Sequence, residues 1–169
     1  MERPGATTLG GNPMTLVGPE LKAGDPAPDF SLLDSSLKPV TLSNTGATTR
    51  IFSVLPSLDT PICDAQTKRF NEESVKLPGV DIYTVSMDLP FAQKRFCGAE
   101  GIANVATLSL MRNHGFAKDY GVLIEDGPLA GLTARAVVVV DADNKVLHSE
   151  LVAEIGSEPN YDAALNVLA

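Results

Sequence analysis

Residues 55–63 read Leu-Pro-Ser-Leu-Asp-Thr-Pro-Ile-Cys, and they join a predicted strand to a predicted helix. The apolar run Ile51–Leu55 leads into this stretch and is typical of a buried strand. Asp64–Phe70 follows it and is typical of the opening of a helix. Pro61 suits the first helical position, because the N–H that proline lacks is not needed there. The junction therefore places Cys63 in the first turn of a helix that follows a strand.

This position favours an ionised cysteine. The N–H groups of a first helical turn have no partner inside the helix, and the helix dipole adds roughly half a positive charge at that end. Both effects favour the thiolate, which is the nucleophilic form of cysteine. Thr60 can place its hydroxyl beside the sulfur, although threonine is also an ordinary helix cap. Pro56 also has an ordinary interpretation, as the residue that ends the strand.

Composition limits the classes of function. The 169 residues are consistent with one domain, and 44% apolar and 20% charged residues are typical of a globular chain. The net charge of -8, without a lysine or arginine cluster, argues against nucleic acid and against anionic membranes as partners. Met1–Met14 lacks a signal-peptide pattern, and no apolar run approaches the ~20 residues of a membrane helix. We therefore expect a cytoplasmic protein.

The chain contains two cysteines, Cys63 and Cys97. In a reducing compartment they are either inert thiols or a working redox pair, rather than a permanent disulfide. His114 and His148 lie far apart, and neither has a cysteine or histidine at the spacing of metal ligands. The sequence has neither a P-loop nor a dinucleotide-binding fingerprint. We therefore expect neither a metal nor another cofactor.

The rest of the chain alternates predicted strands and helices. A small hairpin is predicted around Gly10-Gly11, between residues 7 and 17. Further strands are predicted at 29–33, 39–42, 50–55, 80–86, 106–111, 133–140 and 146–152. Helices are predicted from Pro61 to the Pro78-Gly79 stop, from Pro90 to a stop at Gly98 and Gly101, over 114–120, and from Pro159 onward.

This order predicts an α/β, thioredoxin-like fold with helices flanking a central sheet. The closing hairpin, formed by strands 133–140 and 146–152, makes the sheet mixed. We expect residues 1–20 to form an N-terminal extension with the small hairpin, and residues 21–169 to form a single thioredoxin-like domain.

Arg135 lies at the start of an apolar run, Ala134–Val140, that should be buried. Burying a charge is costly unless another group pairs with it. A guanidinium stays protonated and offers five N–H donors in a fixed fork. Arg135 could therefore hold Cys63 as a thiolate and bind an oxyanion leaving group. The alternative, that Arg135 marks a strand end and pairs with a surface carboxylate, stays open at this point.

The pattern Pro56-x-x-x-Thr60-x-x-Cys63 resembles the active-site signature of the peroxiredoxin family, and the chain is most similar to its bacterial thiol peroxidase subfamily, atypical 2-Cys peroxiredoxins. The resemblance extends from about residue 14 to the end of the chain. It departs from the family at Leu55, where an aromatic residue is common, and in the first dozen residues. Besides the signature around Cys63, the resemblance rests on three further segments: Asp88-Leu-Pro-Phe-Ala-Gln-Lys-Arg-Phe-Cys-Gly-Ala-Glu-Gly101, Asp126-Gly127-Pro128 and Ala134-Arg135-Ala136.

The resemblance implies a role for five residues. Cys63 matches the peroxidatic cysteine, which attacks a peroxide and becomes a sulfenic acid. Thr60 matches the hydroxyl that positions thiolate and peroxide, and Pro56 matches the residue that shields the thiolate from water. Arg135 matches the arginine that stabilises the thiolate and the developing negative charge. Cys97 matches the resolving cysteine, which forms an intramolecular Cys63–Cys97 disulfide. The implied substrates are H2O2 and alkyl hydroperoxides, the implied reductant is thioredoxin-like, and the implied assembly is a homodimer.

A disulfide requires Cα atoms within roughly 7 Å, whereas Cys63 and Cys97 belong to separate predicted helices. We therefore predict that they are too far apart in the reduced protein, and that one or both helices unwind during turnover. Because of Gly98 and Gly101, we expect the predicted helix that carries Cys97 to unwind more readily than the one that carries Cys63.

Two other functions stay open from the residues alone. A thiol–disulfide oxidoreductase usually carries Cys-x-x-Cys at the helix start, and the lone Cys63 counts against that class. A redox sensor without enzymatic activity is the second alternative. Four apolar residues could either line a pocket for alkyl hydroperoxides or belong to the core: Leu58, Ile62, Leu89 and Phe91.

Overall fold

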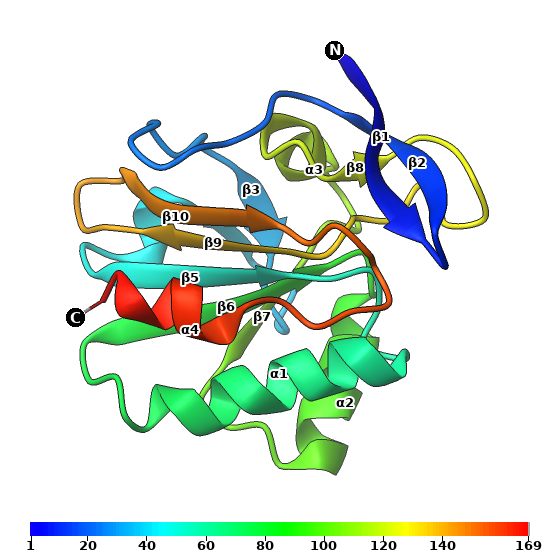
Figure 1. The fold of residues 1–169 in the computed structure, drawn as a ribbon. Coiled ribbons are helices and arrows are strands. Elements are labelled where there is room, and N and C mark those ends of the chain that lie inside the picture. Colours follow the sequence, from blue (N-terminus) through cyan, green and yellow to red (C-terminus); the bar gives the residue numbers. More distant parts are fainter. Residues whose placement is uncertain (169) are drawn as a thin grey trace.

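A seven-stranded mixed sheet forms the centre of the computed structural model, which describes residues 1–168 (Figure 1). The last residue of the predicted domain therefore lies outside the described residues. The strand order is β10-β9-β5-β6-β7-β3-β4. These strands are β3 (Ser31–Leu33), β4 (Pro39–Thr41), β5 (Thr49–Val54), β6 (Val80–Ser86), β7 (Ala106–Ser109), β9 (Ala136–Val140) and β10 (Val146–Leu151). The helices are α1 (Pro61–Ser74), α2 (Pro90–Glu100), α3 (Gly115–Asp119) and α4 (Tyr161–Asn166), with a 3-10 turn at Ser43–Thr45.

The three central strands run parallel, β5 beside β6 and β6 beside β7. Parallel neighbours need a crossover connection, and α1 and α2 supply the two crossovers. The outer strands are antiparallel, with β9 and β10 on one side and β3 and β4 on the other. The prediction of a mixed α/β sheet flanked by helices is confirmed.

Alternation along the strands divides the core into two layers. Ile51 packs in a cluster with Phe70 of α1 and Tyr161 of α4, whereas its neighbour Phe52 packs in a cluster with Phe116 of α3. Figure 1 shows the same division, with α1, α2 and α4 below the sheet and α3 above it. All five residues of β9 are buried, and burying one such side chain contributes about 1.5–3 kcal/mol. Both faces of the sheet are therefore covered, and α1 is fixed against β5.

The N-terminal hairpin consists of β1 (Glu2–Leu9) and β2 (Asn12–Val17), and it is longer than the sequence predicted. Gly10 and Gly11 have φ angles of 58° and 83°, which suit a two-residue turn of the type that matches strand twist. A two-residue strand, β8 (Leu123–Ile124), completes a second sheet in the order β1-β2-β8.

Several predicted boundaries are wrong for local reasons. The strand expected at 133–140 begins at Ala136, because Thr133 instead bridges to Leu123 and donates its hydroxyl to the carbonyl of Leu55 at 2.8 Å. Helix α2 continues through Gly98, and Gly101, with a φ of 69°, forms its cap.

Three further elements, two helices and a strand, are shorter than predicted at one end. Helix α1 ends at Ser74, and its predicted last residues form turns. Strand β7 ends at Ser109, and α4 begins at Tyr161 with Asn160 as its cap. Strand β8 and the 3-10 turn were not predicted, because segments of two or three residues have no detectable period.

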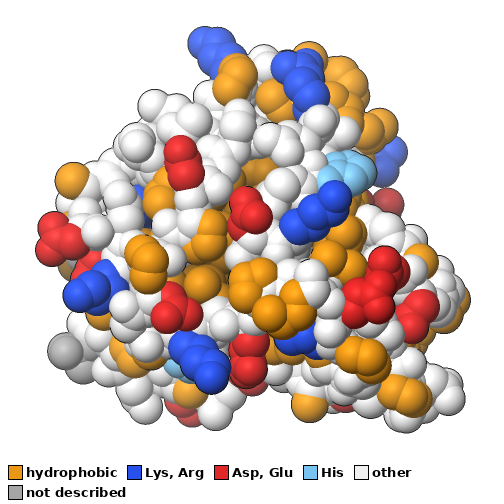
Figure 2. All heavy atoms as spheres, turned by 90° about the horizontal axis from the view of Figure 1, so that it is seen from above, with side chains coloured by type: hydrophobic (Ala, Val, Ile, Leu, Met, Phe, Trp, Pro, Cys, Tyr) orange, Lys and Arg blue, Asp and Glu red, His pale blue; other side chains and the backbone are white. Residues whose placement is uncertain are grey.

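The surface carries mixed charge. On the face drawn in Figure 2, acidic and basic side chains are interspersed around an apolar centre. Within residues 1–168, none of the helices is long and apolar enough to span a membrane.

Candidate active site

The junction between β5 and α1 carries the cysteine as predicted. Thr60 is the residue before the helix and has an extended backbone, and Pro61 is the first helical residue. Cys63 follows in the first turn and is completely buried. It packs with Leu55, Leu58 and the partly buried Phe96 of α2. The helix N-terminus thus directs its partial positive charge toward a sulfur that is shielded from bulk water.

Arg135 reaches this sulfur from just before β9. Its side chain is 2% exposed, and Nη1 lies 3.3 Å from Cys63 Sγ and 3.0 Å from Oε1 of Gln66. Its Nε donates to the carbonyl of Ile155 at 2.9 Å. Among the described residues Arg135 makes no ion pair, so the alternative of a surface carboxylate partner is wrong. Of the three groups that it contacts, only the Cys63 thiol can become an anion.

Gln66 holds the guanidinium from the helix side. It is completely buried, it accepts from Arg135, and its Nε2 donates to Ser53 Oγ of β5 at 2.6 Å. Sequence reasoning did not assign Gln66 a role. The available signal was its position three residues after Cys63, which places both side chains on the same face of a helix.

Thr60 and Pro56 lie at the mouth of the site. The hydroxyl of Thr60 donates to the carbonyl of Ser57 at 3.0 Å, which leaves its oxygen free to accept a hydrogen bond from another group. Among the described residues the structure gives it no hydrogen bond to Cys63. Pro56 is buried, and both residues line the cavity that leads to Arg135.

This cavity has a volume of about 220 Å³ and an almost entirely apolar wall. Of the four apolar residues considered above, only Ile62 lines it. Leu58 is buried beside Cys63, whereas Leu89 and Phe91 are 50% and 63% exposed. The wall combines the start of α1, the hairpin tip and three loops: Leu9, Pro56, Ser57, Thr60, Pro61, Ile62, Leu129, Leu132, Arg135, Ile155 and Gly156.

Cys97 occupies a different environment on α2. It is half-buried and unbridged, it packs in the cluster that includes Phe70, and it borders a separate hollow beside Lys94. Burial raises the pKa of its thiol. The two cysteines therefore belong to different clusters, and the predicted unwinding that would join them stays a prediction.

Asp88 links the two cysteine-bearing regions and was not assigned a role from the sequence. Its Oδ1 accepts from Ser57 Oγ at 2.8 Å, and its Oδ2 accepts from the backbone N–H of Leu58 at 2.8 Å and from Ser86 Oγ at 2.7 Å. Asp88 lies two residues before Pro90, where α2 begins. It therefore ties the segment beside Cys63 to the helix that carries Cys97.

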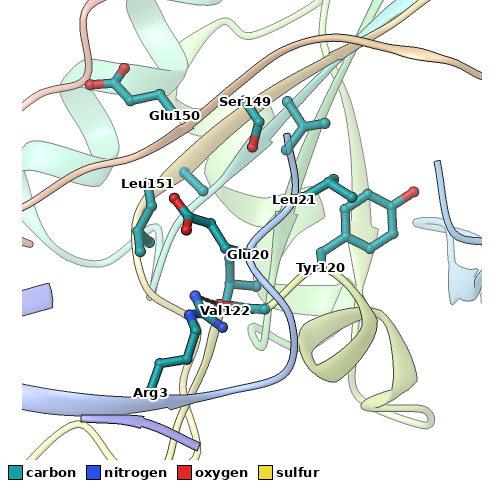
Figure 3. A pocket seen from close by; sticks show the side chains of 11 residues that line it. Arg3, Glu20, Leu21, Tyr120, Val122, Ser149, Glu150 and Leu151 are labelled. Carbon is teal, nitrogen blue, oxygen red and sulfur yellow. Dashed lines mark hydrogen bonds between the residues drawn. The ribbon is translucent and has the colours of Figure 1, made fainter. Parts of the chain in front are cut away.

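A second cavity, shown in Figure 3, is lined by Arg3 of the hairpin and by residues of β9 and β10. Its volume is about 30 Å³, enough for only one or two water molecules. Arg3 donates to the backbone carbonyls of Gly18 and Gly121 beside it. The side chains labelled in Figure 3 include neither a cysteine nor a histidine, so they supply neither a thiol nor an imidazole.

The comparisons with known proteins agree with this geometry. The Redoxin family profile matches residues 22–165. The thiol peroxidase of Halalkalibacterium halodurans is 49% identical over 158 residues, which cover 94% of this chain and 93% of that protein. The thiol peroxidase of Bacillus subtilis is 50% identical over 155 residues, covering 92% and 91%. A crystal structure of a peroxiredoxin-like protein from Aquifex aeolicus has a TM-score of 0.90 and 46% identity, covering 96% and 94%.

The similarity to these proteins extends over most of the chain. The chain belongs to the redoxin family and, within it, to the thiol peroxidases, a group of peroxiredoxin enzymes. The resemblance stated from the sequence and the thioredoxin-like fold are both confirmed.

Proposed function

We propose that the enzyme reduces H2O2 and alkyl hydroperoxides with Cys63 as the attacking thiolate. One observation carries the proposal: a buried guanidinium without a carboxylate partner among the described residues lies 3.3 Å from Cys63 Sγ. A buried charge of this kind is costly unless a counter-charge balances it. A Cys63 thiolate supplies that counter-charge, so each group stabilises the charged form of the other.

In the first step the thiolate attacks the terminal oxygen of the peroxide. An S–O bond forms as the O–O bond breaks, and the leaving alkoxide or hydroxide takes up a proton to become an alcohol or water. Arg135 lines the cavity and its Nη1 lies 3.3 Å from the sulfur, so its N–H donors can stabilise the charge that develops on the departing oxygen. The Thr60 hydroxyl donates its hydrogen bond to the carbonyl of Ser57, so its oxygen can accept a hydrogen bond from the peroxide O–H.

In the second step Cys97 resolves the sulfenic acid on Cys63. The Cys97 sulfur attacks, a Cys63–Cys97 disulfide forms and water leaves. The thiolate is the attacking form, and burial raises the pKa of Cys97 in the closed helix. Opening of α2 would therefore both bring Cys97 closer and favour its ionisation.

A thioredoxin-like dithiol then completes the cycle. It reduces the Cys63–Cys97 disulfide and is itself oxidised to a disulfide, so two electrons pass from the dithiol to the peroxide. We further propose a cytoplasmic location, which such a reducing partner suits, and a homodimer, on the family resemblance. Light scattering of the purified protein tests the assembly.

The cavity also supports the proposed substrate range. Its volume of about 220 Å³ and its apolar wall suit an alkyl or aryl group, because burying apolar surface is favourable. The test is peroxide consumption coupled to thioredoxin and its reductase, with H2O2 and cumene hydroperoxide in parallel. We expect turnover of both peroxides and none in Cys63→Ser. Turnover that persists in Cys63→Ser would refute the proposal.

A further inference from the structure

The segment after β10 lies between the N-terminal hairpin and the active-site arginine. The backbone N–H of Thr8 in β1 donates to the carbonyl of Ala153 at 2.9 Å, and the N–H of Ile155 donates back to the carbonyl of Thr8 at 2.9 Å. These two bonds place Thr8 and Glu154 in a parallel bridge. The hairpin is therefore paired with residues 153–155.

The Glu154 carboxylate strengthens this junction. Its Oε1 accepts from the Thr8 hydroxyl at 2.8 Å and from the N–H of Gly11 at 2.9 Å. Its Oε2 accepts from the N–H of Gly10 at 3.1 Å and from the N–H of Gly156 at 2.9 Å. These hydrogen bonds lower the pKa of Glu154 to about 2. One ionised side chain thus binds the hairpin turn and the following loop together.

The same segment anchors Arg135. The carbonyl of Ile155, the residue after Glu154, accepts from Arg135 Nε at 2.9 Å. Because a guanidinium is planar and rigid, holding Nε constrains the direction in which Nη1 points, and Nη1 lies 3.3 Å from Cys63 Sγ. Ile155 and Leu9 of the hairpin tip also line the cavity that leads to Arg135.

We propose that Glu154 is a positioning residue for Arg135, and that the N-terminal hairpin is thereby a working part of the active site. The line of contact runs from the Gly10-Gly11 turn through Glu154 and the Ile155 carbonyl to Arg135, and from there to Cys63. The proposal rests on the proposed function, in which Arg135 acts on Cys63 and on the departing oxygen.

The test compares Glu154→Ala and Glu154→Gln with Glu72→Gln. Glu72 is exposed on α1, and the structure gives its side chain no hydrogen bond or ion pair among the described residues. The direct readout is the Nε–H signal of Arg135 in a nitrogen–proton correlation spectrum, followed by hydrogen exchange. Arg50 supplies an internal reference, because its Nε–H donates to the Thr48 carbonyl at 2.9 Å, away from the hairpin.

We expect Glu154→Ala to shift the Arg135 signal and to speed its exchange, with the Arg50 signal unchanged. The rate constant for oxidation of Cys63 by H2O2 should fall about tenfold, since even a 1 Å misplacement of a reacting group can cost about 100-fold. Glu154→Gln keeps one acceptor oxygen and should give an intermediate loss, and Glu72→Gln should give none.

The proposal is overturned if Glu154→Ala and Glu154→Gln leave both the Arg135 signal and the oxidation rate at their wild-type values. It is also overturned if Arg50 and Arg135 respond equally, because that result indicates general loosening of the fold. If the wild-type protein itself consumed no peroxide, the proposed function would fail, and the Arg135 signal would still decide whether Glu154 positions the guanidinium.

Discussion

The two cysteines of this enzyme lie in contrasting surroundings. Cys63 is completely buried in a first helical turn and has a hydrogen bond from a buried arginine. Cys97 is half-buried in the second half of α2, and burial raises the pKa of its thiol. The first environment favours charge on sulfur, and the second disfavours it. Under the proposed function, this contrast means that one cysteine reacts in the closed fold, whereas the other reacts after its helix opens.

The largest effect that the contrast predicts is at the nucleophile. Replacing Cys63 with serine should lower the peroxidase rate by roughly 10⁴-fold or more, because loss of an enzyme's nucleophile removes the covalent step. Replacing Cys97 with serine should instead allow one equivalent of peroxide to be reduced, after which the enzyme stalls. Peroxide consumption per mole of protein, without a reductant, distinguishes the two variants. Equal peroxide consumption by the two variants would contradict the proposal that Cys63 attacks the peroxide and Cys97 acts afterwards.

The next largest effect separates the two buried arginines. Arg135→Met should lower the rate constant for Cys63 oxidation by about 10²–10³-fold, the cost of losing a donor to a developing oxyanion. Arg50 is also completely buried, but it donates to oxygens such as the carbonyls of Thr48 and Asp141. Arg50→Met should therefore lower the melting temperature and leave that rate constant of the folded enzyme near the wild-type value. Oxidation of Arg135→Met at the wild-type rate would refute the electrostatic role of this arginine.

A smaller effect concerns the pH dependence of resolution. Because burial raises the pKa of Cys97, the thiolate fraction at neutral pH is small and grows as the pH rises toward that pKa. Disulfide formation should accelerate by at most about tenfold per pH unit in this range. The chain has no tryptophan, so rapid quenching and mass spectrometry are the suitable measurement. A rate that does not change with pH would show that Cys97 ionisation does not limit resolution.

The smallest effect tests the opening of α2. Gly98 lies inside this helix, and among the described residues no atom from outside the helix lies within 4 Å of the position that a Cβ would take. Gly98→Ala should therefore stabilise α2 by about 0.5–1 kcal/mol. If α2 must unwind, disulfide formation should slow by about two- to fivefold. Gly101 has a φ of 69°, so Gly101→Ala should strain the cap and speed the same step. Identical rates in both variants would argue against unwinding.

Much of the fold was predictable because its signals are local. The apolar runs of β5 and β9, the alternation of β6 and the turn at Pro78-Gly79 each determine an element within a few residues. The strand predicted at 133–140 was too long, because Thr133 bridges to Leu123 of β8 and the N–H of Ala134 donates to the carbonyl of Val122, so this part of the backbone pairs away from the central sheet.

The site was predictable only in part, because local sequence signals do not show which residues far apart in the chain come together. Cys63, Thr60 and Pro56 lie within one junction, so their proximity follows from the sequence. Arg135 lies 72 residues from the cysteine that it contacts, and its assignment needed the family resemblance. Residues whose role depends on distant partners went unassigned: Gln66, Asp88 and Glu154.

The most direct test of the account is the ultraviolet absorbance of thiolate at neutral pH in two single-cysteine variants. Cys97→Ser retains only Cys63, and Cys63→Ser retains only Cys97. We expect a thiolate signal near one per molecule in the first variant, abolished by adding Arg135→Met, and a small signal in the second. Equal signals from the two variants, or a Cys63 signal that survives the loss of Arg135, would contradict the central claim that the buried guanidinium holds Cys63 as an anion.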